Sequence, residues 1–193
     1  MIFRREINHK LVCGNIEVIC GSMFSGKTEE LIRRLKRLGY ANKTFKVFKP
    51  EIDTRNKKNS IQSHSNIEIE AQTVNKAAEI LKYKGSFDVI GIDEAQFFSN
   101  DIVEVCNTLA DSGVRVIVAG LDMDYSGKPF GPMPNLMAIA EEVTKVHAVC
   151  ADTGLPALYS FRKLENDDVV MLGEKNEYKP LSRKAFVSKM KKK

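Results

Sequence analysis

One short motif constrains the fold of this chain more than any other feature. GSMFSGKT, residues 21–28, fits the pattern GxxxxGK[ST], with a mostly apolar stretch at residues 16–20 before it and an amphipathic stretch at residues 28–38 after it. A glycine-rich turn between a buried strand and a helix presents backbone N–H groups and the positive end of the helix to a phosphate. We therefore predict a strand, a phosphate-binding loop (P-loop) and a helix at this place.

The residues of the P-loop predict how a nucleoside triphosphate is held. The two glycines allow the backbone to approach the phosphates closely. Lys27 is expected to reach the β- and γ-phosphate oxygens, and the Thr28 hydroxyl is expected to bind Mg²⁺. The expected ATP-binding residues are Gly21, Ser22, Met23, Phe24, Ser25, Gly26, Lys27 and Thr28, together with Asp93, Glu94, Ala95 and Gln96 from a second motif.

That second motif is DVIGIDE, residues 88–94. Its apolar run predicts a buried strand ending at Asp93, an acid that in P-loop proteins holds Mg²⁺ directly or through water. The adjacent Glu94 points in a different direction, so we expect it to act as the general base toward an attacking hydroxyl or water. A surface glutamate at a strand-to-helix junction is the alternative interpretation of Glu94.

The rest of the chain alternates short apolar runs with amphipathic stretches, which predicts an α/β domain with a mostly parallel sheet. Further strands are predicted at 45–48, 67–71, 88–93 and 114–121, and further helices at 76–83, 101–112 and 135–142. Residues 51–66 have no apolar periodicity and are predicted to form a mobile polar loop. Two β-like runs at 157–163 and 168–172 predict a small β appendage, with a boundary near residue 143.

Composition and charge exclude some classes and leave others open. The chain of 193 residues fits one principal domain and holds no apolar run near the roughly 20 residues of a membrane span. Its polar N-terminus does not fit a signal peptide, so we expect a cytoplasmic protein with no membrane partner. The four cysteines form no CxxC pair and are expected to be reduced and buried. Lysines 189 and 191–193 supply four of the positive charges behind the net +5, which predicts a solvated basic tail.

Apolar and aromatic residues surround the two motifs. Met23 and Phe24 lie in the P-loop, Phe97 and Phe98 follow Glu94, and a loop rich in glycine and proline contributes Leu121, Tyr125 and Phe130. Each could belong to the core, and Phe24 and Phe98 are interpreted in that way. A water-splitting ATPase needs no aromatic pocket there, whereas a kinase acting on a planar organic molecule does. The pattern favours a phosphotransferase.

Four segments in this order resemble the thymidine kinase family of the cytosolic, P-loop type: GSMFSGKT, DTR at residues 53–55, GIDEAQFF at 91–98 and GLDMDYSGKPFGPMPNL at 120–136. The resemblance covers residues 16–178. It implies a RecA-like P-loop NTPase domain with a small C-terminal β lasso domain, and transfer of the ATP γ-phosphoryl group to the 5′-hydroxyl of thymidine or deoxyuridine. It also implies a homotetramer and feedback inhibition by thymidine triphosphate, with no nucleic-acid partner.

The resemblance also assigns roles to individual residues. Glu94 matches the catalytic base, and Thr28, Asp53, Arg55 and Asp93 match the phosphate and magnesium neighbourhood. The family reads the base mainly through backbone groups of the lasso. The residues that match the nucleoside site are Met23, Phe97, Leu121, Tyr125, Phe130, Val169, Met171, Gly173 and Tyr178.

The expected organisation is an N-terminal extension at 1–15, a kinase domain at 16–143, a lasso domain at 144–182 and a basic tail at 183–193. The family's lasso commonly holds a zinc ion, but here Cys150 stands alone and Thr153 occupies the place of a second ligand. Even with His147, two ligands are too few for a structural zinc site. We therefore expect ATP and Mg²⁺ as cofactors and a lasso without zinc.

Two alternatives remain open at this point. A RecA-like ATPase acting on nucleic acid would share the P-loop, the acid pair and the basic tail. A catalytically inactive P-loop protein acting through its oligomer would be favoured by the missing zinc ligands, but Lys27, Thr28, Asp93 and Glu94 argue against it.

Overall fold

The computed structural model describes residues 13–53, 60–62, 68–163 and 177–191. Its centre is a six-stranded sheet of order β5-β2-β6-β7-β1-β8 in which all neighbouring strands are parallel. The strands are Asn15–Gly21 (β1), Phe45–Pro50 (β2), Gln72–Val74 (β5), Val89–Ile92 (β6), Arg115–Leu121 (β7) and Glu142–Val146 (β8). The predicted α/β class with a mostly parallel sheet is confirmed.

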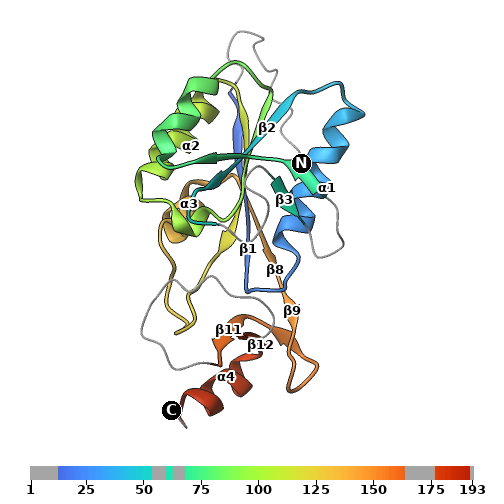
Figure 1. Cartoon of the computed structure of the whole chain (residues 1–193), viewed down its shortest axis with the longest axis vertical. Coiled ribbons are helices and arrows are strands. Elements are labelled where there is room, and N and C mark those ends of the chain that lie inside the picture. Colours follow the sequence, from blue (N-terminus) through green and yellow to red (C-terminus); the bar gives the residue numbers. More distant parts are fainter. Residues whose placement is uncertain (1–12, 54–59, 63–67, 164–176, 192–193) are drawn as a thin grey trace, which may run out of the picture.

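Helices cover both faces of this sheet (Figure 1). Helix α1 (Lys27–Gly39) lies on one face, and α2 (Asp101–Asp111), α3 (Met133–Ile139) and the 3₁₀ segment η1 (Ala77–Tyr83) lie on the other. In β1, Val18 packs into the core with α2 and α3, while Ile19 packs into the core with α1. Burial on both faces explains why the central strands β6 and β7 are nearly continuous apolar runs.

The parallel arrangement places four strand ends at one edge of the sheet. β1 runs into the P-loop, β2 into residues 51–53, β6 into Asp93 and β7 into residues 122–132. Gly21 lies beside Leu121, and Phe48 lies beside Ile92. Residues far apart in the sequence therefore meet at this edge, where open α/β sheets bind ligands.

A small appendage follows the sheet, in the lower part of Figure 1. It consists of Ala148–Val149 (β9), Pro156–Ala157 (β10), Tyr159–Arg162 (β11), Tyr178–Leu181 (β12) and the helix Arg183–Met190 (α4). β9 pairs with β10 and β11 pairs with β12, both antiparallel. The appendage has a core of its own, in which Tyr159 stacks on Phe186 with ring centroids 4.3 Å apart.

The prediction of a solvated basic tail at 183–193 is wrong for its first eight residues, because Arg183–Met190 form α4. Phe186 of this helix is buried against Tyr159 and Phe161. The lysines dominate the composition of the segment, but the buried Phe186 ring and an ion pair between Lys189 and Asp152 hold the helix against the appendage.

Other boundaries also differ from the predictions. Within the loop expected at 51–66, Ser60–Gln62 form β3, which pairs with Glu68–Glu70 (β4), and Ile61 is buried in the core beneath α1. The helix expected at 135–142 runs over Met133–Ile139 instead, starting from prolines that favour a first turn. The division at residue 143 falls inside β8, a strand of the main sheet. The strand expected at 168–172 lies outside the described residues.

Cys20, Cys106 and Cys150 are buried, whereas Cys13 is exposed, contrary to expectation. Within the described part of the chain, no helix is both long and apolar enough to cross a membrane.

Candidate functional site

The P-loop is wrapped tightly between β1 and α1. A Cβ on Gly21 would lie 2.2 Å from the carbonyl oxygen of Val146, so only glycine permits the approach of β8 at this point. Gly26 adopts a left-handed conformation with φ of 84° directly before α1. The Lys27 ammonium, almost buried, donates to the carbonyl oxygen of Ser22 at 2.8 Å. The lysine therefore lies across the loop whose N–H groups would surround a phosphate.

Thr28 and Asp93 meet at the base of the loop. The Thr28 hydroxyl donates to Asp93 Oδ2 at 3.0 Å, and the backbone N–H of Glu94 donates to Asp93 Oδ1 at 2.9 Å. Burial of Asp93 and the neighbouring Glu94 charge raise its pKa above the ordinary value, although Thr28 and Lys27 act in the opposite direction. A hydroxyl and a carboxylate at this distance are the hard oxygen ligands that Mg²⁺ prefers, so the residues fit the ion.

Glu94 is held by a chain of polar contacts that reaches β7. Its backbone is left-handed, with φ of 52° and ψ of 39°, a strained conformation for a residue other than glycine. The Gln96 carboxamide donates to Glu94 Oε2 at 2.5 Å and accepts the N–H of Leu121 through Oε1 at 2.9 Å. Gln96 is buried, so its own side chain is held in place and orients the Glu94 carboxylate.

An apolar wall follows Glu94. Phe97 and Phe130 pack edge to face, with centroids 5.8 Å apart and an interplanar angle of 88°. Both rings and Leu121 are only partly buried, as a ligand-facing wall requires, whereas Phe98 is buried in the core as expected. The structure therefore brings three of the predicted nucleoside residues to the edge that carries Glu94.

The appendage docks on the P-loop. The Met23 N–H donates to Ser160 Oγ at 2.9 Å, and the Ser22 hydroxyl donates to the carbonyl oxygen of Ala157 at 3.3 Å. Ala157 is the last residue of β10, and Ser160 lies in β11. Ser160 was not among the predicted site residues, and its sequence context YSFR reads only as a strand.

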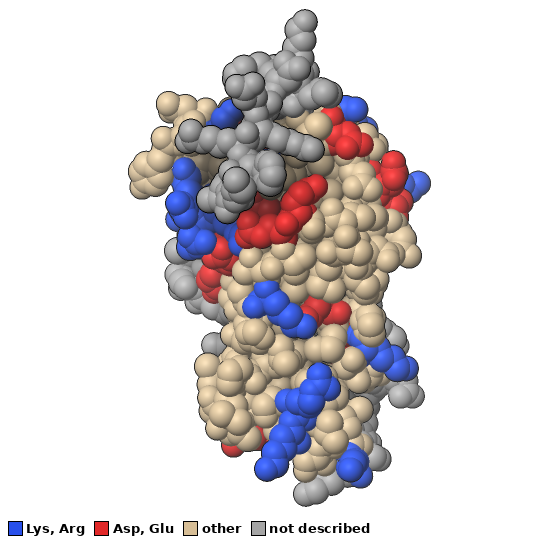
Figure 2. Space-filling model, turned by 180° about the vertical axis from the view of Figure 1, so that it is seen from behind, with Lys and Arg blue, Asp and Glu red and all other residues tan. Residues whose placement is uncertain are grey.

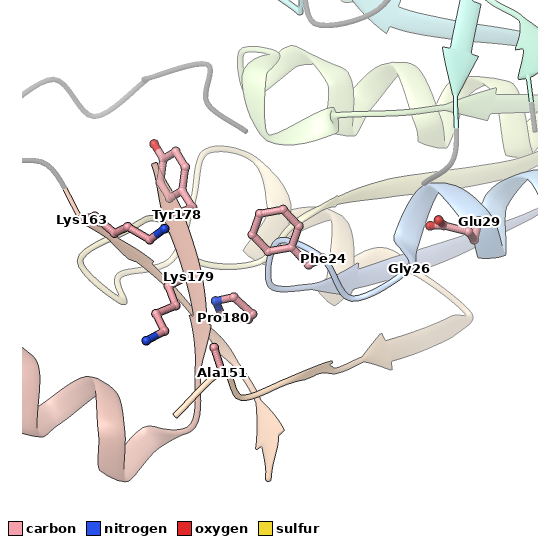
Figure 3. Close-up of a pocket in the computed structure, with 8 residues that line it drawn as sticks. All are labelled: Phe24, Gly26, Glu29, Ala151, Lys163, Tyr178, Lys179 and Pro180. Carbon is pink, nitrogen blue, oxygen red and sulfur yellow. The ribbon is translucent and has the colours of Figure 1, made fainter. Parts of the chain in front are cut away.

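A cavity of about 610 Å³ lies between the P-loop and the hairpin of β11 and β12. Figure 3 shows the Phe24 ring facing Tyr178 and Lys163 across it, with Glu29 of α1 at the opposite end. Phe24 was expected in the core, but it is partly exposed and packs against the appendage. The other residues that line the cavity are Gly26, Ala151, Lys179 and Pro180.

The end of β2 carries a buried ion pair that the sequence did not predict. Lys49 is fully buried, and its Nζ lies 3.7 Å from Asp53 Oδ2, a carboxylate that is also buried. Asp53 thus lies at the same edge of the sheet as the P-loop and Asp93, where the strands end. Its predicted neighbour Arg55 lies outside the described residues, as do Val169, Met171 and Gly173.

Around Cys150 the side chains are hydroxyls rather than metal ligands. Thr153 Oγ1 lies 3.4 Å from Ser182 Oγ, and both hydroxyls hydrogen bond with the Cys150 thiol. Over residues 13–53, 60–62, 68–163 and 177–191, no group of three His, Cys, Asp or Glu side chains is placed to hold a metal ion. A P-loop magnesium site needs fewer protein ligands, because phosphates and water complete its coordination.

Known proteins resemble this chain closely. A family model described as thymidine kinase matches residues 14–186. A curated thymidine kinase of Bacteroides fragilis is 54% identical over 173 residues, which cover 90% of this chain and 87% of that protein. One from Porphyromonas gingivalis is 54% identical over 188 residues (96% and 92%), and one from Rhodothermus sp. is 50% identical over 180 residues (93% and 84%).

Among solved structures, the genome packaging NTPase B204 from Sulfolobus turreted icosahedral virus 2, in complex with ATP-gammaS, aligns with a TM-score of 0.46 and 15% identity. The alignment covers 72% of this chain and 77% of that one.

Proposed function

Because the chain belongs to the thymidine kinase family, we propose that it transfers the γ-phosphoryl group of ATP to the 5′-hydroxyl of thymidine, and also of deoxyuridine. The observation that carries this proposal is the placement of Glu94. Its carboxylate is held by Gln96, directly after the Asp93 that contacts Thr28 of the P-loop. A base beside a phosphate site and an apolar wall suits a hydroxyl acceptor on an organic molecule.

In the proposed reaction, P-loop N–H groups and Lys27 hold the β- and γ-phosphates. Thr28 and Asp93 would hold Mg²⁺, which when bound offsets negative charge on the phosphate oxygens. The 5′-hydroxyl oxygen forms the new bond to the γ-phosphorus while the bond to the β–γ bridging oxygen breaks, and ADP leaves. Glu94 accepts the hydroxyl proton, and positioning of the two reactants supplies most of the rate enhancement.

Met23, Phe97, Leu121, Tyr125 and Phe130 are proposed to surround the nucleoside. Aromatic rings that pack edge to face offer an apolar surface on which a planar pyrimidine can lie. Thymidine triphosphate carries the same base together with a triphosphate, so it is proposed as the feedback inhibitor that occupies both parts of the site.

We propose that the protein is a cytoplasmic homotetramer, as the family resemblance implies. The exposed Val143 on the edge strand β8, and the exposed Val149 and Leu155 in the appendage, offer apolar surface for contacts between copies. Light scattering after size exclusion would test this, since a mass equal to that of one chain contradicts the tetramer.

The alternative function is an ATPase acting on nucleic acid. On the face shown in Figure 2, basic side chains lie in separate groups with acidic and uncharged surface between them, rather than in one continuous basic stripe. This distribution favours a small-molecule acceptor over a nucleic-acid track.

Labelled ATP distinguishes the two functions. The protein is incubated with [γ-³²P]ATP, Mg²⁺ and each deoxynucleoside in turn, and in a parallel arm with single-stranded DNA. We expect labelled monophosphate with thymidine and deoxyuridine only. Release of inorganic phosphate that DNA stimulates and nucleosides do not would establish the ATPase instead.

A further inference from the structure

The strand β11 presents different residues to its two sides. Tyr159 and Phe161 pack against Phe186 of α4 and form the core of the appendage. The alternate residues, Ser160 and Arg162, point away from that core, because side chains alternate along a strand. Ser160 accepts the N–H of Met23 in the P-loop at 2.9 Å. This second face of β11 therefore meets the kinase domain.

Arg162 is the charged member of that face, and only 2% of its surface is exposed. Its guanidinium carbon lies 3.5 Å from the centroid of the Tyr125 ring. On the neighbouring strand it stands opposite Tyr178, with which its side chain forms a hydrogen bond. One buried arginine thus contacts two tyrosines from different parts of the chain, one in the loop after β7 and one in β12.

Tyr125 is one of the proposed nucleoside residues, and Tyr178 matches the nucleoside site in the family resemblance. The loop that carries Tyr125 also carries Phe130, which packs on Phe97 beside Glu94. A planar guanidinium can lie flat on one ring while its edge N–H groups reach a phenol oxygen. A lysine ammonium is a point charge, so it can keep the attraction to the ring but cannot supply both contacts in one fixed geometry.

We propose that Arg162 is a positioning residue for nucleoside binding, which acts by holding Tyr125 and Tyr178 in the arrangement that the nucleoside meets. This inference rests on the proposed function. It predicts that loss of Arg162 weakens nucleoside binding and leaves the ATP site intact, since Lys27 contacts the P-loop carbonyl of Ser22 and Thr28 contacts Asp93.

The test compares Arg162→Met and Arg162→Lys with the wild-type protein, with kcat and both KM values measured separately. Arg183→Met is the matched control, because Arg183 also lies over a tyrosine of the appendage, Tyr159, at 5.3 Å, but on the side of α4. We expect Arg162→Met to raise the KM for thymidine about tenfold. The KM for ATP should stay within twofold, Arg162→Lys should recover part of the loss, and Arg183→Met should leave both KM values unchanged.

Three results would overturn the inference. They are an unchanged KM for thymidine in Arg162→Met, an equal rise of both KM values, and an equal effect of Arg183→Met. If Arg162→Met does not fold, Arg162→Lys decides, and an unchanged KM for thymidine in that variant counts against the inference. If the wild-type protein itself phosphorylates no nucleoside, the proposed function fails and the inference fails with it. A wild-type enzyme active on thymidine isolates the role of Arg162.

Discussion

The Gln96 carboxamide donates a 2.5 Å hydrogen bond to Glu94 Oε2 and accepts the N–H of Leu121 through its oxygen. The proposed base is therefore connected to the end of β7, the strand that leads into the apolar loop. Gln96 was predicted as an ATP-binding residue, but its observed contacts connect Glu94 with the nucleoside side of the site.

Replacing Gln96 should lower the rate of the chemical step. In Gln96→Ala the Glu94 carboxylate loses the hydrogen bond from Gln96, and the loss of orientation is expected to reduce kcat up to about 100-fold with little change in the KM for ATP. Gln72→Ala is the control, because Gln72 also accepts a partly buried hydrogen bond, from Tyr83, but lies on β5, which does not pair with the strand β6 that leads to Glu94. Steady-state kinetics with thymidine would test this, and equal kcat values for wild type and Gln96→Ala would contradict it.

The contact between Thr28 and Asp93 predicts a magnesium phenotype. Thr28→Val keeps the shape of the side chain but removes the hydroxyl, so the enzyme should need a higher Mg²⁺ concentration for half-maximal activity and turn over more slowly. Thr28→Ser retains the hydroxyl and should behave like the wild type. Activity measured over a Mg²⁺ titration distinguishes them, and identical curves for all three proteins would remove Thr28 from this role.

Glu17 predicts a pH dependence of stability. Burial alone would raise the pKa of Glu17, but hydrogen bonds from Arg115, Asn15 and Arg34 outweigh it and lower the pKa below the ordinary 4.5. A lowered pKa in the folded state means that the contribution to stability is complete above about pH 4.5 and is lost as the pH falls through the folded value. This charge connects β1 to β7 and α1.

Glu17→Gln should therefore reduce the free energy of unfolding by about 3 kcal/mol near pH 7. The difference from the wild type should shrink as the pH falls below about 4.5, because the unfolded wild-type chain then takes up a proton at Glu17 while the folded protein does not. Urea unfolding at a series of pH values measures both quantities. A difference that stays constant down to about pH 3 would show that the charge of Glu17 is not the cause.

Phe186 tests the unexpected order of the C-terminal segment. Phe186→Ala removes the ring that stacks on Tyr159 and should lower the free energy of unfolding by about 3 kcal/mol. Val187→Ala is the matched control in the same helix, since Val187 is 44% exposed. Thermal unfolding of both variants is the measurement. Equal stabilities of Phe186→Ala and Val187→Ala would contradict the packing of this helix and support the solvated tail that the lysines predict.

The sequence predicted those elements of the fold whose formation depends on neighbouring residues in the chain. The P-loop, the strand before it and the helix after it are found within one residue of the expected bounds, because glycine geometry and apolar periodicity act over a few residues. The strand ending at Asp93 follows the same logic, and its contact with Thr28 follows from the parallel order of β1 and β6 in the sheet.

The residues that the sequence missed depend on contacts between distant segments. Lys49 is buried because Asp53 lies beside it, and Arg162 is buried because a tyrosine from another loop covers it. Neither side chain carries a local pattern that separates it from a surface cation. β8 was missed for the same kind of reason, since its alternating polar residues qualify as a strand only through pairing with β1.

The central claim is that the γ-phosphoryl group of ATP is transferred to thymidine with Glu94 as the general base. A single labelled reaction tests this claim most directly. Wild type, Glu94→Gln and the control Glu104→Gln, which changes an exposed glutamate of α2, are each incubated with [γ-³²P]ATP, Mg²⁺ and thymidine. We predict labelled thymidine monophosphate from the wild type and the control, and a rate lower by about 10²-fold or more from Glu94→Gln with ATP binding retained. Equal product from Glu94→Gln and the wild type, or phosphate released equally with and without thymidine, would contradict the account.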